Sequence, residues 1–415
     1  MRDTEWKDKM DGIVPGTPLD VERFFKLDIL EPAIPGHVEA IILEGDRIGQ
    51  LWFIFSEIYT DQSIHFKVSD DAGRTWQEDW TAQDSAGQDI RGFHVSVLRL
   101  KSGRLGMIYS DTDEEYGHPG RENYKMVYYR ASDDGGHTWG DPVLLDRTHS
   151  CCCSGHAVVL SSGRILAPAF RWISPLSGGE AEDWNPRDGV PSPTFSYSFV
   201  YISDDEGKTW KRSLSELFIS VNRAAWDLEE PIVVELGDGR LLMHLRTAMG
   251  RIYKSYSSDS GLSWTHPEPV PIAAANTPSF IRRIPSTGEL LMIWSQASRQ
   301  EIVTNKCRTR LSCAISKDEG ETWENFKNLE ALDDVTQVTP PPASDTIACQ
   351  PYEVYDNLQP EPDERYHRVP GALRVCYPTI AFAGDEVAIA YDIGRGIYKG
   401  LGTRLRVIPL EWFRE

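Results

Sequence analysis

The sequence SDDAGRTW at residues 69–76 is the first copy of a phrase that occurs five times along this chain. The other copies read SDDGGHTW, SDDEGKTW, SSDSGLSW and SKDEGETW, which gives the shared pattern S-x-D-x-G-x-[T/S]-W. The acidic positions recur about every 55 to 70 residues, a period typical of architectures in which each repeat is one supersecondary unit. They are Asp71, Asp134, Asp205, Asp259 and Asp318.

The phrase has a structural explanation. An aspartate carboxylate can accept hydrogen bonds from the backbone N–H groups of its own turn, and glycine permits a left-handed backbone conformation. The tryptophan can bury a large ring between neighbouring repeats. We therefore expect five turns that stabilise the fold and take no part in catalysis.

A second repeat consists of an apolar run, a tight turn and another apolar run. Glycine-containing turns between such runs predict β-hairpins. Its six copies begin at His37, His94, His156, Glu230, Pro278 and Tyr377. Six hairpins, five of them followed by a further strand and an aspartate turn, predict an all-β protein, a six-bladed β-propeller. A long β-sandwich with similar turns is the alternative.

The expected domain organisation is one propeller over residues 1–415, with an N-terminal arm over about the first 30 residues. The stretch TRLRVIPLEW near the C-terminus is expected to supply an outer strand that closes the ring.

The net charge of −20 argues against nucleic acid or an anionic membrane as a partner, because both require a basic surface. An acidic ligand would need a locally basic pocket. The N-terminal stretch has no apolar core typical of a secretion signal, and the seven cysteines show no disulfide framework spacing. These features predict a cytoplasmic location; the oligomeric state is left open.

The aspartate turns resemble the Asp boxes of the sialidase superfamily, and the six hairpins match the six-bladed propeller of that family. Members hold a substrate carboxylate with three arginines and use a tyrosine nucleophile paired with a glutamate. The resemblance of EPIVVEL implies a catalytic role for Glu230, and that of VCYPTIAF implies the nucleophile role for Tyr377. LLMHLR and RTRLSCAISKDEG imply substrate-binding roles for Arg246 and Arg308, and the loop FSEIYTDQ offers Asp61 as acid/base.

Histidines depart from the family pattern. His37 stands where the family has its first arginine, so the resemblance leaves the acidic sugar open. His94 and His156 begin two further inner strands. Three imidazoles that converge on an axis could bind substrate or, in an alternative hypothesis, a divalent metal. The run HSCCCSGH at 149–156 lacks zinc-site spacing and is interpreted as a tight loop of small side chains that lines the pocket floor.

The blade topology predicts that all these candidates reach one face. Strand heads and the loops between second and third strands lie on that face, whereas the aspartate turns lie on the other. Two long loops, at 174–194 and 350–371, are expected on the candidate face, where loops on a rigid scaffold commonly bind ligands.

The leading hypothesis is an exo-acting glycoside hydrolase that releases a terminal carboxylated sugar, without a cofactor and by a retaining mechanism with a tyrosine nucleophile. A second hypothesis is a metal-dependent sugar lyase or hydrolase that uses His37, His94 and His156. A third is a non-catalytic carbohydrate-binding propeller.

Overall fold

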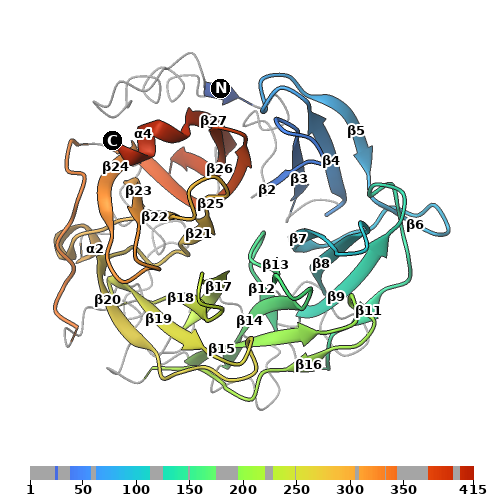
Figure 1. Cartoon of the computed structure of the whole chain (residues 1–415), viewed down its shortest axis with the longest axis horizontal. Helices are drawn as coiled ribbons and strands as arrows, with labels where there is room; N and C mark the ends of the chain where they lie inside the picture. Colours follow the sequence, from blue (N-terminus) through green and yellow to red (C-terminus); the bar gives the residue numbers. More distant parts are fainter. Residues whose placement is uncertain are drawn as a thin grey trace, which may run out of the picture.

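Six β-sheets are arranged radially around a central axis (Figure 1), which confirms the predicted six-bladed β-propeller. The structure is a computed structural model. It describes residues 24–26, 38–57, 62–112, 125–147, 150–173, 195–219, 228–247, 249–303, 308–331, 333–343, 373–395 and 402–415.

Blades 1 to 3 use the first half of the chain. Their strands, from the axis outward, are β2 (Val38–Glu44), β3 (Leu51–Glu57), β4 (Ile64–Ser69) and β5 (Gln77–Thr81) in blade 1; β7 (Phe93–Arg99), β8 (Leu105–Thr112), β9 (Lys125–Ser132) and β11 (Val143–Leu144) in blade 2; and β12 (Cys151–Cys152) with β13 (Val158–Val159), then β14 (Ile165–Ile173), β15 (Phe195–Ser203) and β16 (Lys211–Arg212) in blade 3. A parallel pair, β6 (Gln83–Asp84) and β10 (Thr138–Trp139), joins blades 1 and 2.

Blades 4 to 6 follow the same antiparallel order. Their strands are β17 (Glu229–Glu235), β18 (Leu241–Arg246), β19 (Arg251–Ser257) and β20 (Glu268–Ala273) in blade 4; β21 (Phe280–Arg283), β22 (Leu290–Ser295), β23 (Leu311–Ser316) and β24 (Glu324–Glu330) in blade 5; and β25 (Leu373–Ala383), β26 (Glu386–Arg395), β27 (Gly402–Pro409) and β1 (Phe24–Lys26) in blade 6. Two short helices, α2 (Arg299–Val303) and α4 (Leu410–Arg414), complete the described elements.

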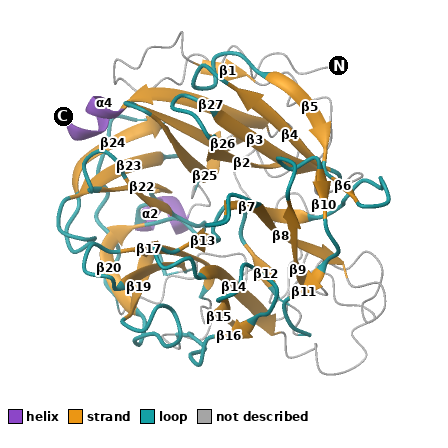
Figure 2. Ribbon diagram, turned by 45° about the vertical axis from the view of Figure 1, so that its right-hand side comes forward, coloured by secondary structure: helices purple, strands orange, loops and turns teal. Residues whose placement is uncertain are grey.

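Closure of the ring differs from the expectation. The C-terminal strand β27 lies third in blade 6, and the outermost position belongs to β1, which pairs antiparallel with it from Phe24↔Arg406 to Lys26↔Arg404. Figure 2 shows β1 next to β27. The N-terminal arm predicted from sequence therefore contains a strand of the last blade, and the two ends of the described chain share one sheet.

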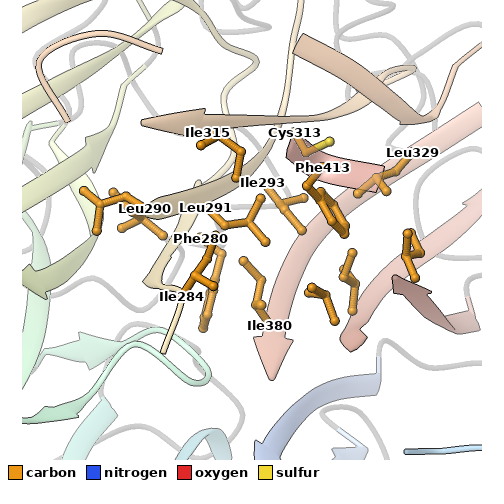
Figure 3. Packing of buried hydrophobic residues seen from close by; sticks show 14 of the residues in the cluster. Phe280, Ile284, Leu290, Leu291, Ile293, Cys313, Ile315, Leu329, Ile380 and Phe413 are labelled. Carbon is orange, nitrogen blue, oxygen red and sulfur yellow. The ribbon is translucent and has the colours of Figure 1, made fainter. Parts of the chain in front are cut away.

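The hydrophobic core lies between the blades. Strands such as β22 and β23 are buried along their whole length because each of their faces packs against a neighbouring sheet. Figure 3 shows Leu291 and Ile293 of blade 5 close to Ile380 of blade 6, within one buried cluster. The oblique view in Figure 2 shows the inner strands facing the axis and the outer strands forming the rim. The axis-facing strand ends are thus held by a rigid, close-packed ring.

The five aspartate turns form as the sequence predicts, each between the third and fourth strand of a blade. In the first turn, Ser69 Oγ donates to Asp71 Oδ1 at 2.8 Å, and the N–H groups of Gly73 and Thr75 donate to Ser69 Oγ and Asp71 Oδ1, each at 2.8 Å. The same three bonds recur in the other four copies. Hydrogen bonds outweigh the effect of burial and lower the pKa of all five carboxyls.

Two of these turns also bind the preceding blade. Glu206 accepts from the N–H of Ser102 at 2.9 Å, and Glu319 accepts from the N–H of Gly237 at 3.0 Å. Each glutamate lies just before the glycine of its turn and has a positive φ, 57° and 64° respectively. The turns therefore connect neighbouring blades as well as neighbouring strands, on the face opposite the candidate site.

Candidate active site

Three inner strands contain a β-bulge at a predicted site residue. The residues His94, Glu230 and Tyr377 have φ values of 55°, 43° and 52°, and the strand register shifts across each of them. Positive φ is uncommon for residues other than glycine, and bulges are frequent next to active sites because they redirect a side chain. A proline follows both Glu230 and Tyr377. A proline is tolerated at a bulge because the strand needs no N–H donor there.

Tyr377 and Glu230 meet although 147 positions separate them in sequence. The Tyr377 hydroxyl donates to Glu230 Oε1 at 3.0 Å, and the glutamate is only 6% exposed. Burial raises the pKa of the Tyr377 phenol well above its usual value, and the charge of Glu230 raises it further. The arrangement pairs a neutral phenol with a buried carboxylate that can accept its proton.

Arg246, the last residue of β18, is held by the same pair. Its Nη1 lies 2.7 Å from Glu230 Oε2 and 3.3 Å from the Tyr377 hydroxyl, and its Nη2 lies 3.6 Å from Glu229 Oε2. Burial alone would lower the pKa of Arg246, but the carboxylates of Glu230 and Glu229 raise it well above its usual value. Two buried carboxylates therefore compensate one guanidinium.

Arg308 lies beside Tyr377 in a different charge environment. Its guanidinium carbon is 5.5 Å from the centre of the Tyr377 ring, and its Nη1 donates to Cys376 Sγ at 3.6 Å. Among the residues that the structure describes, no carboxylate pairs with Arg308. The site thus contains one half-buried cation whose charge is not compensated within the described chain, and such a group favours an anionic ligand.

The position of Arg308 is fixed from both sides. Its main-chain oxygen accepts from the N–H of Val375, two residues before Tyr377. Two residues further along, the buried Arg310 binds both oxygens of Asp333 at 2.8 and 2.7 Å and also binds Glu301 at 3.0 Å. The strand carrying the tyrosine and the segment carrying the arginine are therefore joined directly.

Asn276 is a site residue that the sequence analysis missed. Its side-chain Oδ1 accepts from Arg246 Nε at 2.7 Å, and its main-chain oxygen accepts from Arg308 Nη2 at 2.6 Å. It lies in the connection between blades 4 and 5, outside both repeats and outside the segments that resemble the family. Only its place between two arginine-bearing blades could have drawn attention to it.

The chain matches the BNR repeat-like domain family over residues 55–389. It belongs to this family. Among solved structures, the Hadza microbial sialidase Hz136 is 15% identical to this chain with a TM-score of 0.57. The match covers 90% of this chain and 65% of the sialidase chain. A sialidase from Trypanosoma rangeli is 16% identical with a TM-score of 0.57, and the match covers 91% of this chain and 56% of that sialidase chain.

A Dyadobacter fermentans protein of unknown function is also similar, at 16% identity and a TM-score of 0.55. This match covers 90% of the present chain and the whole of the Dyadobacter chain. These likenesses show the propeller fold, and the chain spans 65% and 56% of the lengths of the two sialidases. No curated protein sequence matches the chain. None of the described helices is long and apolar enough to span a membrane.

The histidines of this BNR repeat-like protein occupy separate surroundings. His156 is buried, and its Nδ1 lies 3.0 Å from the main-chain oxygen of Pro231, so a carbonyl orients the ring between blades 3 and 4. His94 is partly buried with its ring edge-on to Phe93. Within the described ranges, no three His, Cys, Asp or Glu side chains form a group that could hold a metal ion. His37, the third histidine of the metal hypothesis, lies outside the described residues.

A small, partly open pocket is lined by Tyr377. Polar side chains from blades 3 and 6 line it, namely Cys153, Ser154, His156, Thr379 and Asp392. Cys153 lines this pocket, in agreement with the interpretation of the cysteine run as a loop of small pocket-lining side chains. Cys151 and Cys152 instead form the short strand β12.

Two further predictions concern parts of the chain that the structure does not describe. The predicted acid/base Asp61 lies outside the described residues, as do the long loops at 174–194 and 350–371. The described site therefore consists of Tyr377, Glu230, Arg246 and Arg308, which the sequence had selected, together with Glu229 and Asn276, which it had not.

Proposed function

We propose that this protein is an exo-acting glycoside hydrolase that releases a terminal carboxylated sugar, such as a nonulosonic acid, from a glycoside. The observation that carries the proposal is the 3.0 Å contact between the Tyr377 hydroxyl and Glu230, with Arg246 2.7 Å from the other carboxylate oxygen. The sialidase-type fold supports the proposal, because sialidases depart from the usual pair of catalytic carboxylates and use a tyrosine nucleophile.

A neutral nucleophile suits an anomeric carbon that already carries a carboxylate. An ionised aspartate or glutamate would be repelled by the substrate carboxylate, whereas a phenol that stays protonated until the reaction would not. The raised pKa of Tyr377 supports this role, since burial and the neighbouring Glu230 keep the hydroxyl neutral at ordinary pH.

In the proposed first step, Glu230 Oε1 accepts the phenolic proton while Tyr377 Oη forms a bond to the anomeric carbon. The glycosidic C–O bond breaks, and its oxygen receives a proton from an acid, the role expected of Asp61. In the second step, water attacks the anomeric carbon and the same acid, now a base, accepts a proton from that water. Tyr377 leaves as a phenol by recovering its proton from Glu230, and two displacements retain the configuration.

Arg308 supports an anionic substrate. A guanidinium without a carboxylate partner in the described chain can bind the substrate carboxylate through charge-assisted hydrogen bonds. Arg246 lies close enough to Tyr377 to contribute to the same region. His37 would occupy the place of the family's first arginine, which this chain lacks.

The test compares hydrolysis of fluorogenic glycosides that carry either a terminal carboxylated sugar or its neutral, carboxylate-reduced analogue. The native protein is expected to hydrolyse at least one acidic glycoside and to prefer it to the neutral analogue. Tyr377→Phe is expected to lower kcat by a factor of about 10³ or more, because it removes the nucleophile, and Glu230→Gln by about 10² to 10⁴.

Blade 6 offers a matched control. The hydroxyl of Tyr391, a residue of the hydrophobic core, donates to the buried Glu330 of blade 5 and forms a second buried tyrosine–glutamate pair. Tyr391→Phe and Glu330→Gln should reduce thermal stability without the loss in kcat. Full activity of Tyr377→Phe and Glu230→Gln would refute the mechanism, and tight binding of acidic glycosides without any turnover would instead identify a binding propeller.

A further inference from the structure

Asn276 joins the two arginines of the site. It lies between β20 and β21, where the chain passes from blade 4 to blade 5, and it contacts an arginine from each. A guanidinium has N–H donors and no acceptor, so the atom of the Asn276 amide that faces Arg246 Nε must be its oxygen. The orientation of this amide is therefore fixed by chemistry.

The segment around Asn276 is itself held in place. The N–H of Ala274 donates to the main-chain oxygen of Gly250 at 3.1 Å, and that of Ala275 donates to Ser295 at 2.9 Å. Ala274, Ala275 and Thr277 are all buried. Asn276 thus presents its two oxygen acceptors from backbone anchored to both neighbouring blades.

The two arginines use their donors differently. Arg246 directs Nε to Asn276, Nη1 to Glu230 and Tyr377, and Nη2 towards Glu229. Among the described residues, the Arg308 side chain makes one strong contact, to the main-chain oxygen of Asn276, and one weak contact to a sulfur. Within the part of the chain that the structure describes, the donors of the first guanidinium all face protein groups, whereas the second keeps donors for a ligand.

We propose that Asn276 is a positioning residue that gives the two arginines different roles. Its side chain aligns Arg246 with Glu230 and Tyr377, so that Arg246 serves the proton-accepting carboxylate. Its main-chain oxygen holds Arg308 at one end, which leaves the rest of that guanidinium to bind the carboxylate of the ligand. This inference rests on the proposed function, and it assigns the anion specificity of the site mainly to one arginine.

Two substitutions at this position separate the two effects. Asn276→Ala removes the acceptor of Arg246 Nε and keeps the main-chain oxygen, so Arg246 should turn away and kcat should fall about tenfold, with KM nearly unchanged. Asn276→Asp keeps an acceptor for Arg246 but adds a negative charge to the residue that touches both arginines. It should therefore raise KM for the acidic glycoside about tenfold while kcat stays closer to the native value.

The kinetic experiment measures kcat and KM of both variants on the acidic glycoside found for the native protein. Asn328→Ala is the control, because the Asn328 amide is hydrogen-bonded in blade 5 to Ser312 and to the main-chain oxygen of Val335, away from the site. A merely structural role would lower stability in Asn276→Ala and Asn328→Ala alike and would not split kcat from KM. Equal kinetics in native protein and both Asn276 variants would overturn the inference.

Crystal structures of the native protein and Asn276→Ala test the same inference without activity. The expected result is an Arg246 side chain displaced from Glu230 and Tyr377 in the variant, with Arg308 unchanged on the main-chain oxygen of residue 276. An Arg246 that keeps its native contacts in the variant would overturn the positioning role. Absence of turnover by the native protein on every acidic glycoside would overturn the proposed function alone.

Discussion

Charge compensation distinguishes the two arginines at the scale of single residues. Arg246 faces two buried carboxylates, and Arg308 faces none within the described residues. An arginine of the second kind is costly to keep in a partly buried site unless a ligand supplies the missing negative charge. We therefore assign anion recognition chiefly to Arg308.

Substitution of Arg308 by glutamine should raise KM for an acidic glycoside by a factor of about 10 to 100, because charge-assisted hydrogen bonds to the carboxylate are lost. The carboxylate-reduced analogue should be hydrolysed equally by the native protein and the variant. Arg283→Gln is the control, since Arg283 binds Glu319 on the opposite face. An unchanged KM for the acidic glycoside in Arg308→Gln would contradict the assignment.

His244 makes stability depend on pH. The residue is 1% exposed, and neither ring nitrogen has a hydrogen-bond partner among the described residues. Burial lowers its pKa from 6.5 to about 3, and the charge of Lys254 acts in the same direction. The unfolded chain therefore binds a proton at this ring below about pH 6.5 while the folded protein does not, and folding stability falls as the pH falls through this range.

His244→Leu should remove this dependence and raise the free energy of unfolding at pH 5 by about 2 kcal/mol relative to its effect at pH 8. Urea denaturation at the two pH values measures the difference. The exposed His266, substituted by glutamine, serves as the control and should show no such change. A pH dependence identical in native protein and His244→Leu would mean that His244 is charged or hydrated in the folded state.

At the scale of elements, the aspartate turns are held by hydrogen bonds within each turn and lie on the face opposite the site. Asp318 accepts from the hydroxyl of Ser316 at 2.9 Å, and from the N–H and hydroxyl of Thr322 at 2.8 and 2.5 Å. Asp318→Ala should lower the free energy of unfolding by about 1 kcal/mol through loss of these bonds, while kcat and KM stay at native values. Asp334→Ala, an exposed aspartate outside any such turn, controls for the loss of charge. A fall in kcat without a fall in stability would contradict the structural role.

The strand β1 closes the ring from the other end of the chain. Its three residues pair with β27, so their removal exposes the edge of blade 6. A variant that lacks residues 1–26 should unfold at a temperature several degrees lower, and its open edge should favour self-association. Calorimetry and light scattering measure these effects. Native thermal stability and a native association state in this variant would show that β1 is dispensable for closure.

Features encoded locally could be predicted from sequence. Each hairpin and each aspartate turn is encoded by one contiguous stretch of sequence. The pattern therefore predicts the number of blades, and it separates the face with the candidate site from the face with the aspartate turns. The pairing of β1 with β27 could not be predicted, because Phe24–Lys26 is too short to show a period and its partner strand is about 380 positions away. The bulges at His94, Glu230 and Tyr377 also escaped prediction, since they depend on the partner strand.

At the scale of the whole molecule, the propeller brings distant segments to one place on the axis. Glu230 lies near the start of the inner strand of blade 4, Tyr377 lies within the inner strand of blade 6, and Arg308 precedes the third strand of blade 5. The resemblance to sialidases selected these residues singly, and the ring geometry explains why they meet. Asn276 and Glu229 could not be selected in this way, because their roles depend on the side chains of a neighbouring blade.

The measurement that tests the central claim most directly is intact-protein and peptide mass spectrometry after incubation with a fluorinated analogue of the acidic sugar that the protein hydrolyses. Such analogues slow the second displacement and allow a covalent intermediate to accumulate. The account predicts one sugar adduct per chain, carried by the peptide that contains Tyr377 and absent from Tyr377→Phe. Hydrolysis of the parent glycoside with the adduct on a different residue, or with an undiminished rate in Tyr377→Phe, would contradict it.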